Sequence, residues 1–168
     1  MIRRHPPAAP LLLALAVAAA ACHADEEFLG PFPSWLDVKR DCGAVGDGKA
    51  DDTAALQKAL GTIRNPDSPK RVMYLPAGTY RITKAIELIR ETHTQSQGVT
   101  VCGEHPDKVV LRWDGPEGGV MFDYGAWFSV VRRITFDGAG RAKTAIRHGP
   151  RFVTANELSD LVVRDVQF

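Results

Sequence analysis

From residue 72 to the end of the chain, short apolar segments alternate with turn residues. Residues 72–75, 79–82 and 99–102 are examples, and glycine or proline borders each of them. About ten such segments follow one another after a single helical pattern, which argues against alternating strands and helices. The pattern predicts an all-β fold built as a sandwich, a barrel or a solenoid.

An internal repeat favours the solenoid. Residues 130–136 (VVRRITF) recur as residues 162–168 (VVRDVQF), 32 residues later. The apolar positions of each copy change phase at a central polar pair, whereas the side chains of one straight strand alternate strictly. Two short strands joined by a two-residue corner explain this change, and a sandwich that mimics the repeat by chance is the alternative. Stacking of such coils would place Val131, Ile134 and Phe136 beneath Val163, Val166 and Phe168.

One helix is predicted before the strand-rich region. Residues 36–42 alternate apolar and charged side chains and predict a first strand, and a glycine-rich turn follows at residues 43–48. Asp51 and Asp52 then precede strong helix formers, so we expect an aspartate N-cap and a helix that ends by about residue 64. Helix capping is favoured for this pair over a carboxylate pair that hydrolyses glycosides. The apolar side of the helix would cover the open end of the first coil with Leu56, Leu60 and Ile63.

The N-terminus is typical of an export signal. A basic start is followed by an apolar run over residues 11–21, which at about 11 residues is shorter than the roughly 20 of a membrane-spanning helix. Cleavage after Ala24 gives a signal peptide of residues 1–24. Cleavage before Cys22 gives a lipoprotein signal of residues 1–21 and a lipid on Cys22. Both alternatives predict a periplasmic or extracellular protein, and only the second adds a membrane anchor.

The rest of the chain divides into a linker, residues 25–35, and one domain, residues 36–168. The net charge of +1 carries no electrostatic signature of a nucleic-acid partner. We expect Cys42 and Cys102 to be two buried thiols, and a disulfide between them is the alternative in an oxidising compartment.

Three side chains are candidate polysaccharide-binding residues. Arg132 and Arg164 are equivalent in the repeat, so two guanidinium groups stacked at one outer corner would hold the carboxylates of a uronic acid polymer. The alternative is a solvated corner with an ion pair between Arg133 and Asp165. Trp113 is the best candidate for an exposed aromatic platform under a sugar ring.

Three motifs resemble those of a known family. Residues 37–57 (DVKRDCGAVGDGKADDTAALQ) resemble the opening of the pectate lyase superfamily, of the rhamnogalacturonase and epimerase type. Residues 74–80 (YLPAGTY) and 99–104 (VTVCGE) resemble its next two signatures. The resemblance covers residues 36–168 and departs at Cys42, where the family usually has an aromatic residue. It implies a right-handed parallel β-helix with an N-terminal capping α-helix.

The resemblance also implies activity on an acidic plant or bacterial polysaccharide, as a lyase, a glycoside hydrolase or an epimerase. Catalytic groups of such relatives usually lie on later coils, and His148 lacks the first glycine of the polygalacturonase Gly-His-Gly motif. We therefore expect a truncated, inactive fragment without identifiable catalytic residues, poorly soluble or oligomeric over residues 25–168. No cofactor or metal site is evident, and calcium is implied by the resemblance alone. The alternative is a non-catalytic glycan-binding module of the adhesin or tailspike kind.

Overall fold

The computed structural model describes residues 31–89, 97–148 and 157–167. The predicted signal segment, Cys22 and Phe168 lie outside the described residues. The helices are α1 (Val38–Cys42) and α2 (Thr53–Arg64), and the strands are β1 (Leu36–Asp37), β2 (Asp47–Asp51), β3 (Val72–Leu75), β4 (Gly78–Ile82), β5 (Ile86–Ile89), β6 (Thr100–Gly103), β7 (Val109–Trp113), β8 (Gly119–Gly125), β9 (Val130–Asp137), β10 (Ala142–His148) and β11 (Glu157–Arg164).

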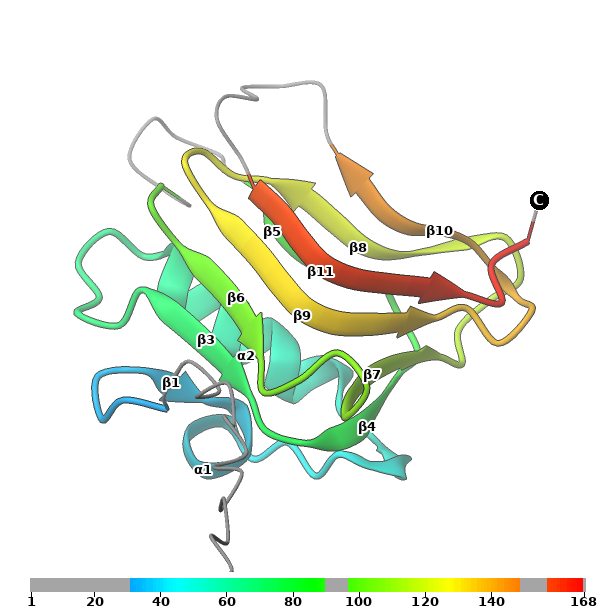
Figure 1. Ribbon diagram of the computed structural model, residues 1–168, viewed down its shortest axis with the longest axis horizontal. Coiled ribbons are helices and arrows are strands. Elements are labelled where there is room, and N and C mark those ends of the chain that lie inside the picture. The colour runs from blue at the N-terminus through cyan, green and yellow to red at the C-terminus, as the bar shows by residue number, and fades with distance from the viewer. Residues whose placement is uncertain (1–30, 90–96, 149–156, 168) are drawn as a thin grey trace, which may run out of the picture.

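The strands form a parallel β-helix. One curled sheet has the order β1-β3-β6-β9-β7-β4-β2 with β11 beside β9, and a second sheet has the order β10-β8-β5. All strand pairs are parallel, and β9 pairs with β6 through its first half and with β7 through its second half. Successive turns of the chain therefore stack from α1 at one end to β10 and β11 at the other (Figure 1). This architecture confirms the predicted solenoid.

The repeat is real, but its predicted register is wrong. Strand β11 lies directly beside β9 in one sheet, as expected, yet Glu157 pairs with Val130 and Arg164 with Asp137. Paired residues are thus 27 positions apart instead of 32. The sequence match aligned the two most similar letter strings, whereas stacking aligns the corners of the coil. The apolar residues above Val131, Ile134 and Phe136 are Leu158, Leu161 and Val163.

A single residue with a left-handed backbone makes the corner in these coils. Arg133 has a φ of 61° and Asp160 a φ of 50°. They occupy equivalent places between the two paired halves of β9 and β11. The predicted two-residue corner is therefore wrong. Arg133 lies at the change of phase in the first copy of the repeat, and Asp165, with a φ of 52°, lies at the change in the second. In the coil below, Gly103 lies so close that a Cβ added to it would collide with the carbonyl oxygen of Arg133. The glycine of the VTVCGE motif therefore permits the backbones to stack at this corner.

The first predicted strand is wrong beyond Asp37. The Asp37 carboxylate accepts hydrogen bonds from the backbone N–H groups of Lys39 (2.9 Å) and Arg40 (3.1 Å), which starts helix α1. Gly43, with a φ of 84°, ends the helix by donating to the Lys39 carbonyl. These two caps outweigh the alternating pattern of the segment.

Helix α2 covers the open end of the first coil, as predicted. It ends at Arg64, packs against β3 and β5, and buries Leu56, Leu60 and Ile63 completely. The predicted N-cap is correct in position only, because the Asp52 side chain makes no capping bond. Its buried carboxylate instead accepts from the Val45 N–H (2.6 Å) and the Gly46 N–H (3.0 Å) of the glycine-rich turn.

The sequence predicts two buried thiols, at Cys42 and Cys102. Both thiols are free, as expected, but Cys42 is only half-buried, whereas Cys102 is fully buried. Of the helices in the described part of the chain, neither is long and apolar enough to cross a bilayer.

Candidate functional site

The structure does not bring Arg132 and Arg164 together. Arg132 pairs with Ser159 in β11 and with Cys102 in β6, whereas Arg164 pairs with Asp137. The predicted column of guanidinium groups is therefore wrong, because residues paired between β9 and β11 are 27 positions apart in the sequence. The Arg164 Nη2 lies 3.1 Å from Asp137 Oδ2.

The predicted corner ion pair between Arg133 and Asp165 is also absent from the described residues. Asp165 lies beside Gly138, where a Cβ on the glycine would contact the Asp165 carbonyl. Arg133 lies at the earlier corner of the coil. The same shift of register separates the two groups.

Trp113 is buried, with 2% of its surface exposed, so the predicted sugar platform is wrong. It stands opposite Ile82 in the neighbouring strand, at an inward position, and its Nε1 donates to the Pro116 carbonyl (3.0 Å). Gly115 and Gly119 pack directly against its ring. The residue belongs to the core of the coil.

A row of charged side chains instead crosses the outer face of the β5–β8–β10 sheet. The registers place Glu87, Asp123 and Arg147 at equivalent positions of the three strands. Buried Ile86 and Leu88 flank Glu87, so the strand alternation turns this row away from the core. We call these three residues the polar row.

The centre of the polar row is a charged pair. Arg147 donates through Nε to Asp123 Oδ1 (3.2 Å) and through Nη2 to Asp123 Oδ2. Asp123 is 7% exposed, whereas the Arg147 side chain is 58% exposed. The hydrogen bond from Arg147 to Asp123 raises the pKa of the guanidinium, so this residue keeps its positive charge at the surface.

Helix α2 holds one end of the row in place. Gln57 accepts from the Glu87 N–H (2.8 Å) and donates to the Glu87 carbonyl (3.0 Å). The backbone of β5 is thereby fastened to the helix, while the Glu87 side chain is exposed. Helix α2, which covers the first coil, thus also positions a carboxylate of the polar row.

Tyr124 and His148 lie next to the row. They pair across β8 and β10, with ring centroids 5.3 Å apart. Tyr124 is fully buried and its hydroxyl contacts Ser129 Oγ. Burial raises the pKa of Tyr124, so its phenol stays neutral. His148 is exposed at the end of β10.

The outer face therefore presents a cation and two carboxylates at neighbouring register positions. His148 follows Arg147 in β10 and contacts buried Tyr124, so its side chain lies on the opposite side of the sheet. A guanidinium pairs with the carboxylates of an acidic ligand, and a carboxylate can accept a proton from a substrate. The described ranges hold no group of three His, Cys, Asp or Glu side chains that would bind a metal ion.

Sequence reasoning missed the polar row. The signal in the sequence is one charged residue between apolar ones in each of three short segments, as in IEL, FDY and IRH. Only the strand register shows that these charges align.

Comparison with known proteins links the chain to polysaccharide-modifying enzymes. Alginate lyase 7 of Azotobacter vinelandii is 32% identical over 112 residues, which cover 59% of this chain and 12% of the relative. Mannuronan C5-epimerase AlgE5 of the same organism is 33% identical over 86 residues, covering 49% and 8%. The chain thus spans about an eighth or less of the length of these relatives.

Solved structures agree on the fold. ORF18 of Geobacillus virus E2 superimposes with a TM-score of 0.59 at 21% identity, over 79% of this chain and 26% of that one. The Agl-KA catalytic domain gives a TM-score of 0.53 at 14% identity, over 79% and 29%. The family model for rhamnogalacturonase A/epimerase, pectate lyase-like proteins matches residues 35–160. Together with the parallel β-helix, that match shows that the chain belongs to the rhamnogalacturonase A/epimerase, pectate lyase-like family.

Proposed function

We propose that this protein acts on an acidic polysaccharide of the alginate type, and that the β5–β8–β10 face contacts the polymer. The polar row carries the proposal, because it aligns charged groups along the direction in which the coils stack. Lyase or epimerase chemistry is favoured over hydrolysis, because the similar proteins are an alginate lyase and mannuronan epimerases.

The two favoured reactions place the same demand on a site. Each begins when a base removes the proton beside the carboxylate of a uronate, which leaves negative charge on that carboxylate. In a lyase the neighbouring C–O bond then breaks and the leaving oxygen takes up a proton, whereas in an epimerase the carbon is reprotonated from the other face. A fixed positive group near the uronate carboxylate stabilises the charge, and Arg147 supplies one here.

The second candidate function is a glycan-binding module without catalysis. The observation that favours it is the Arg147–Asp123 pair, because it occupies the buried carboxylate of the row. A carboxylate held in an ion pair is a poor proton acceptor. Under this alternative Arg147 binds the polymer and no product forms.

We also propose that the protein is exported, as the N-terminal residues predict. Cleavage after Ala24 would release a free protein, and lipidation at Cys22 would anchor it. Mass spectrometry of the mature N-terminus and detergent partitioning distinguish the two, and a protein that keeps its first 21 residues would contradict export through this signal.

The test of function compares turnover and binding. The chain is incubated with mannuronan, polygalacturonate and neutral dextran. Ultraviolet absorbance detects unsaturated lyase products, and NMR of the anomeric protons detects epimerisation. New reducing ends that form without ultraviolet absorbance report hydrolysis. Affinity electrophoresis in the same polymers measures binding. We expect binding to the two polyuronates and not to dextran.

Arg147→Gln should weaken polyuronate binding about tenfold, the effect of losing a charged hydrogen bond. Lys108→Gln, which removes one exposed charge in the turn before β7, should change it less than about twofold. Arg147→Lys should keep part of the affinity, and circular dichroism checks that each variant is folded. Equal binding of dextran and polyuronate, or no effect of Arg147→Gln, would reject the proposed face.

A further inference from the structure

A second cluster of charges lies away from the polar row, on the outer face of β4 and β7. It surrounds a pocket of about 360 Å³. This volume is at the lower end of the roughly 300–1,000 Å³ of small-molecule sites and suits one sugar unit. The pocket is lined by Gly48, Arg81, Arg112, Trp113, Asp114, Ala139 and Arg141.

The charges of the pocket are unbalanced. Three guanidinium groups face one carboxylate, an excess of two positive charges. Asp114 is shared, since its Oδ2 lies 2.7 Å from Arg81 Nη2 and its Oδ1 lies 3.5 Å from Arg141 Nη1. Arg81 also donates through Nε to Asp114 Oδ2 (2.7 Å).

Arg112 has no anionic partner within the described residues. It stands directly opposite Arg81 in the neighbouring strand, an arrangement of like charges that destabilises a sheet. On its other side it pairs with Asp137, but the Asp137 carboxylate is engaged by Arg164 (3.1 Å) and by the Ala139 N–H (2.9 Å).

We propose that this pocket binds the carboxylate of one uronate unit of an acidic saccharide, with Arg112 as the main contact. Guanidinium groups match the planar geometry of a carboxylate. The positive excess comes from the residues themselves, whereas the choice of a saccharide as the carrier rests on the proposed function. Bound carboxylate would relieve the repulsion between Arg81 and Arg112.

The pocket is distinct from the polar row. Arg141 immediately precedes β10 and Arg147 lies near its end, six residues later. At about 3.3 Å per residue these positions are roughly 20 Å apart, so one sugar unit cannot contact both. The pocket is therefore an additional anchoring site on another sheet.

The experiment is calorimetric titration of the full chain with a mannuronate trisaccharide, its methyl ester, sodium acetate and inorganic phosphate. The acid should bind and the neutral ester should not. Arg112→Gln should raise the Kd for the acid at least about tenfold, and Arg112→Lys should give an intermediate value. Lys108→Gln should change the Kd less than about twofold.

Unfolding without ligand separates binding from a structural role. Because Arg112 opposes Arg81, Arg112→Gln should leave the Tm of the ligand-free chain unchanged or raise it. The trisaccharide should raise the Tm of the wild-type chain but not that of Arg112→Gln. Unchanged saccharide affinity in Arg112→Gln would overturn the proposal. Binding of phosphate or acetate with no binding of the trisaccharide would overturn the saccharide assignment.

The same titration keeps the two proposals apart. If Arg112→Gln abolishes trisaccharide binding while Arg147→Gln leaves polymer binding intact, the pocket stands and the proposed face fails. The opposite pattern rejects the pocket alone.

Discussion

At the scale of single residues, the stacking corner depends on one missing side chain. Gly103 sits beneath the left-handed Arg133, and even a methyl group there would collide with the Arg133 carbonyl. Backbone atoms cannot move aside as a flexible side chain can. The close approach of two coils, more than any demand on its own φ angle, explains why a glycine occupies this position.

We therefore predict that Gly103→Ala destabilises the protein by more than about 2 kcal/mol, because the coils must separate at the corner. The matched change is Gly61→Ala on α2, where an added Cβ would meet no atom within 4 Å. That variant should be about 0.5–1 kcal/mol more stable, since alanine favours helix. Urea unfolding measures both, and equal stabilities for the two variants would contradict the close approach.

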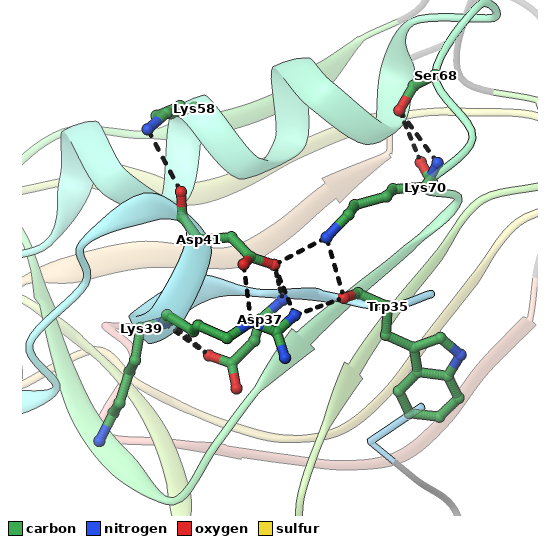
Figure 2. A network of polar contacts seen from close by, with 8 residues as sticks. Trp35, Asp37, Lys39, Asp41, Lys58, Ser68 and Lys70 are labelled. Atoms are coloured by element: carbon green, nitrogen blue, oxygen red, sulfur yellow. Dashed lines mark hydrogen bonds and ion pairs between the residues drawn. The ribbon is translucent and has the colours of Figure 1, made fainter. Parts of the chain in front are cut away.

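At the scale of elements, a polar network fastens α1 to the segment before β3. Asp41 Oδ1 lies 2.8 Å from Arg40 Nε, and Asp41 Oδ2 lies 3.0 Å from Lys70 Nζ. The same oxygen accepts from the Asp37 N–H (3.0 Å), and Lys70 also reaches the Trp35 carbonyl (Figure 2). One carboxylate thus joins the helix to two other segments.

The network predicts a pH effect. The hydrogen bond from Arg40, with that from Lys70, lowers the pKa of Asp41 despite partial desolvation. A lowered folded-state pKa means that Asp41 stabilises the fold above its unfolded pKa, near 4. This stabilisation is lost as the pH falls through the folded pKa.

Asp41→Asn should therefore cost up to about 1 kcal/mol at pH 7, the scale of a surface ion pair. The cost should shrink steadily as the pH falls below about 4. Asp67→Asn, at an exposed carboxylate with no ion pair in the described part of the chain, is the control and should show neither effect. Chemical denaturation across this pH range measures the difference, and a cost that grows in acid would contradict the network.

At the scale of the whole molecule, the last described strand exposes an apolar surface. Leu158, Val162 and Val163 are 47%, 41% and 55% exposed. Among the described strands, β11 pairs with β9 alone, so its other edge has no strand partner in that part of the chain. Exposed strand edges with apolar side chains promote self-association.

We predict that this chain self-associates through β11, in agreement with the expectation from the sequence. Val163→Lys should shift the chain toward monomer, because a charged side chain on an edge opposes pairing. Val45→Lys, at a valine that is 51% exposed in the glycine-rich turn, should leave the association unchanged. Sedimentation velocity measures the distribution, and a wild-type monomer at high concentration would contradict the prediction.

The sequence alone determined the all-β solenoid, the capping helix and the family. These features depend on local signals: short apolar segments, Leu56, Leu60 and Ile63 at helical spacing, and the Gly and Pro residues between strands. Such signals report which face of an element is apolar. They act over a few residues, so the sequence carries them directly.

The register and the two candidate sites are set by the stacking of distant segments in the fold. A repeat in the sequence aligned Arg132 with Arg164, but stacking pairs Arg164 with Asp137 because the left-handed corners must coincide. The polar row joins residues from three strands, and the arginine pocket joins residues from four segments. Their alignment depends on loop lengths and backbone hydrogen bonds between coils, which no local pattern of side chains specifies.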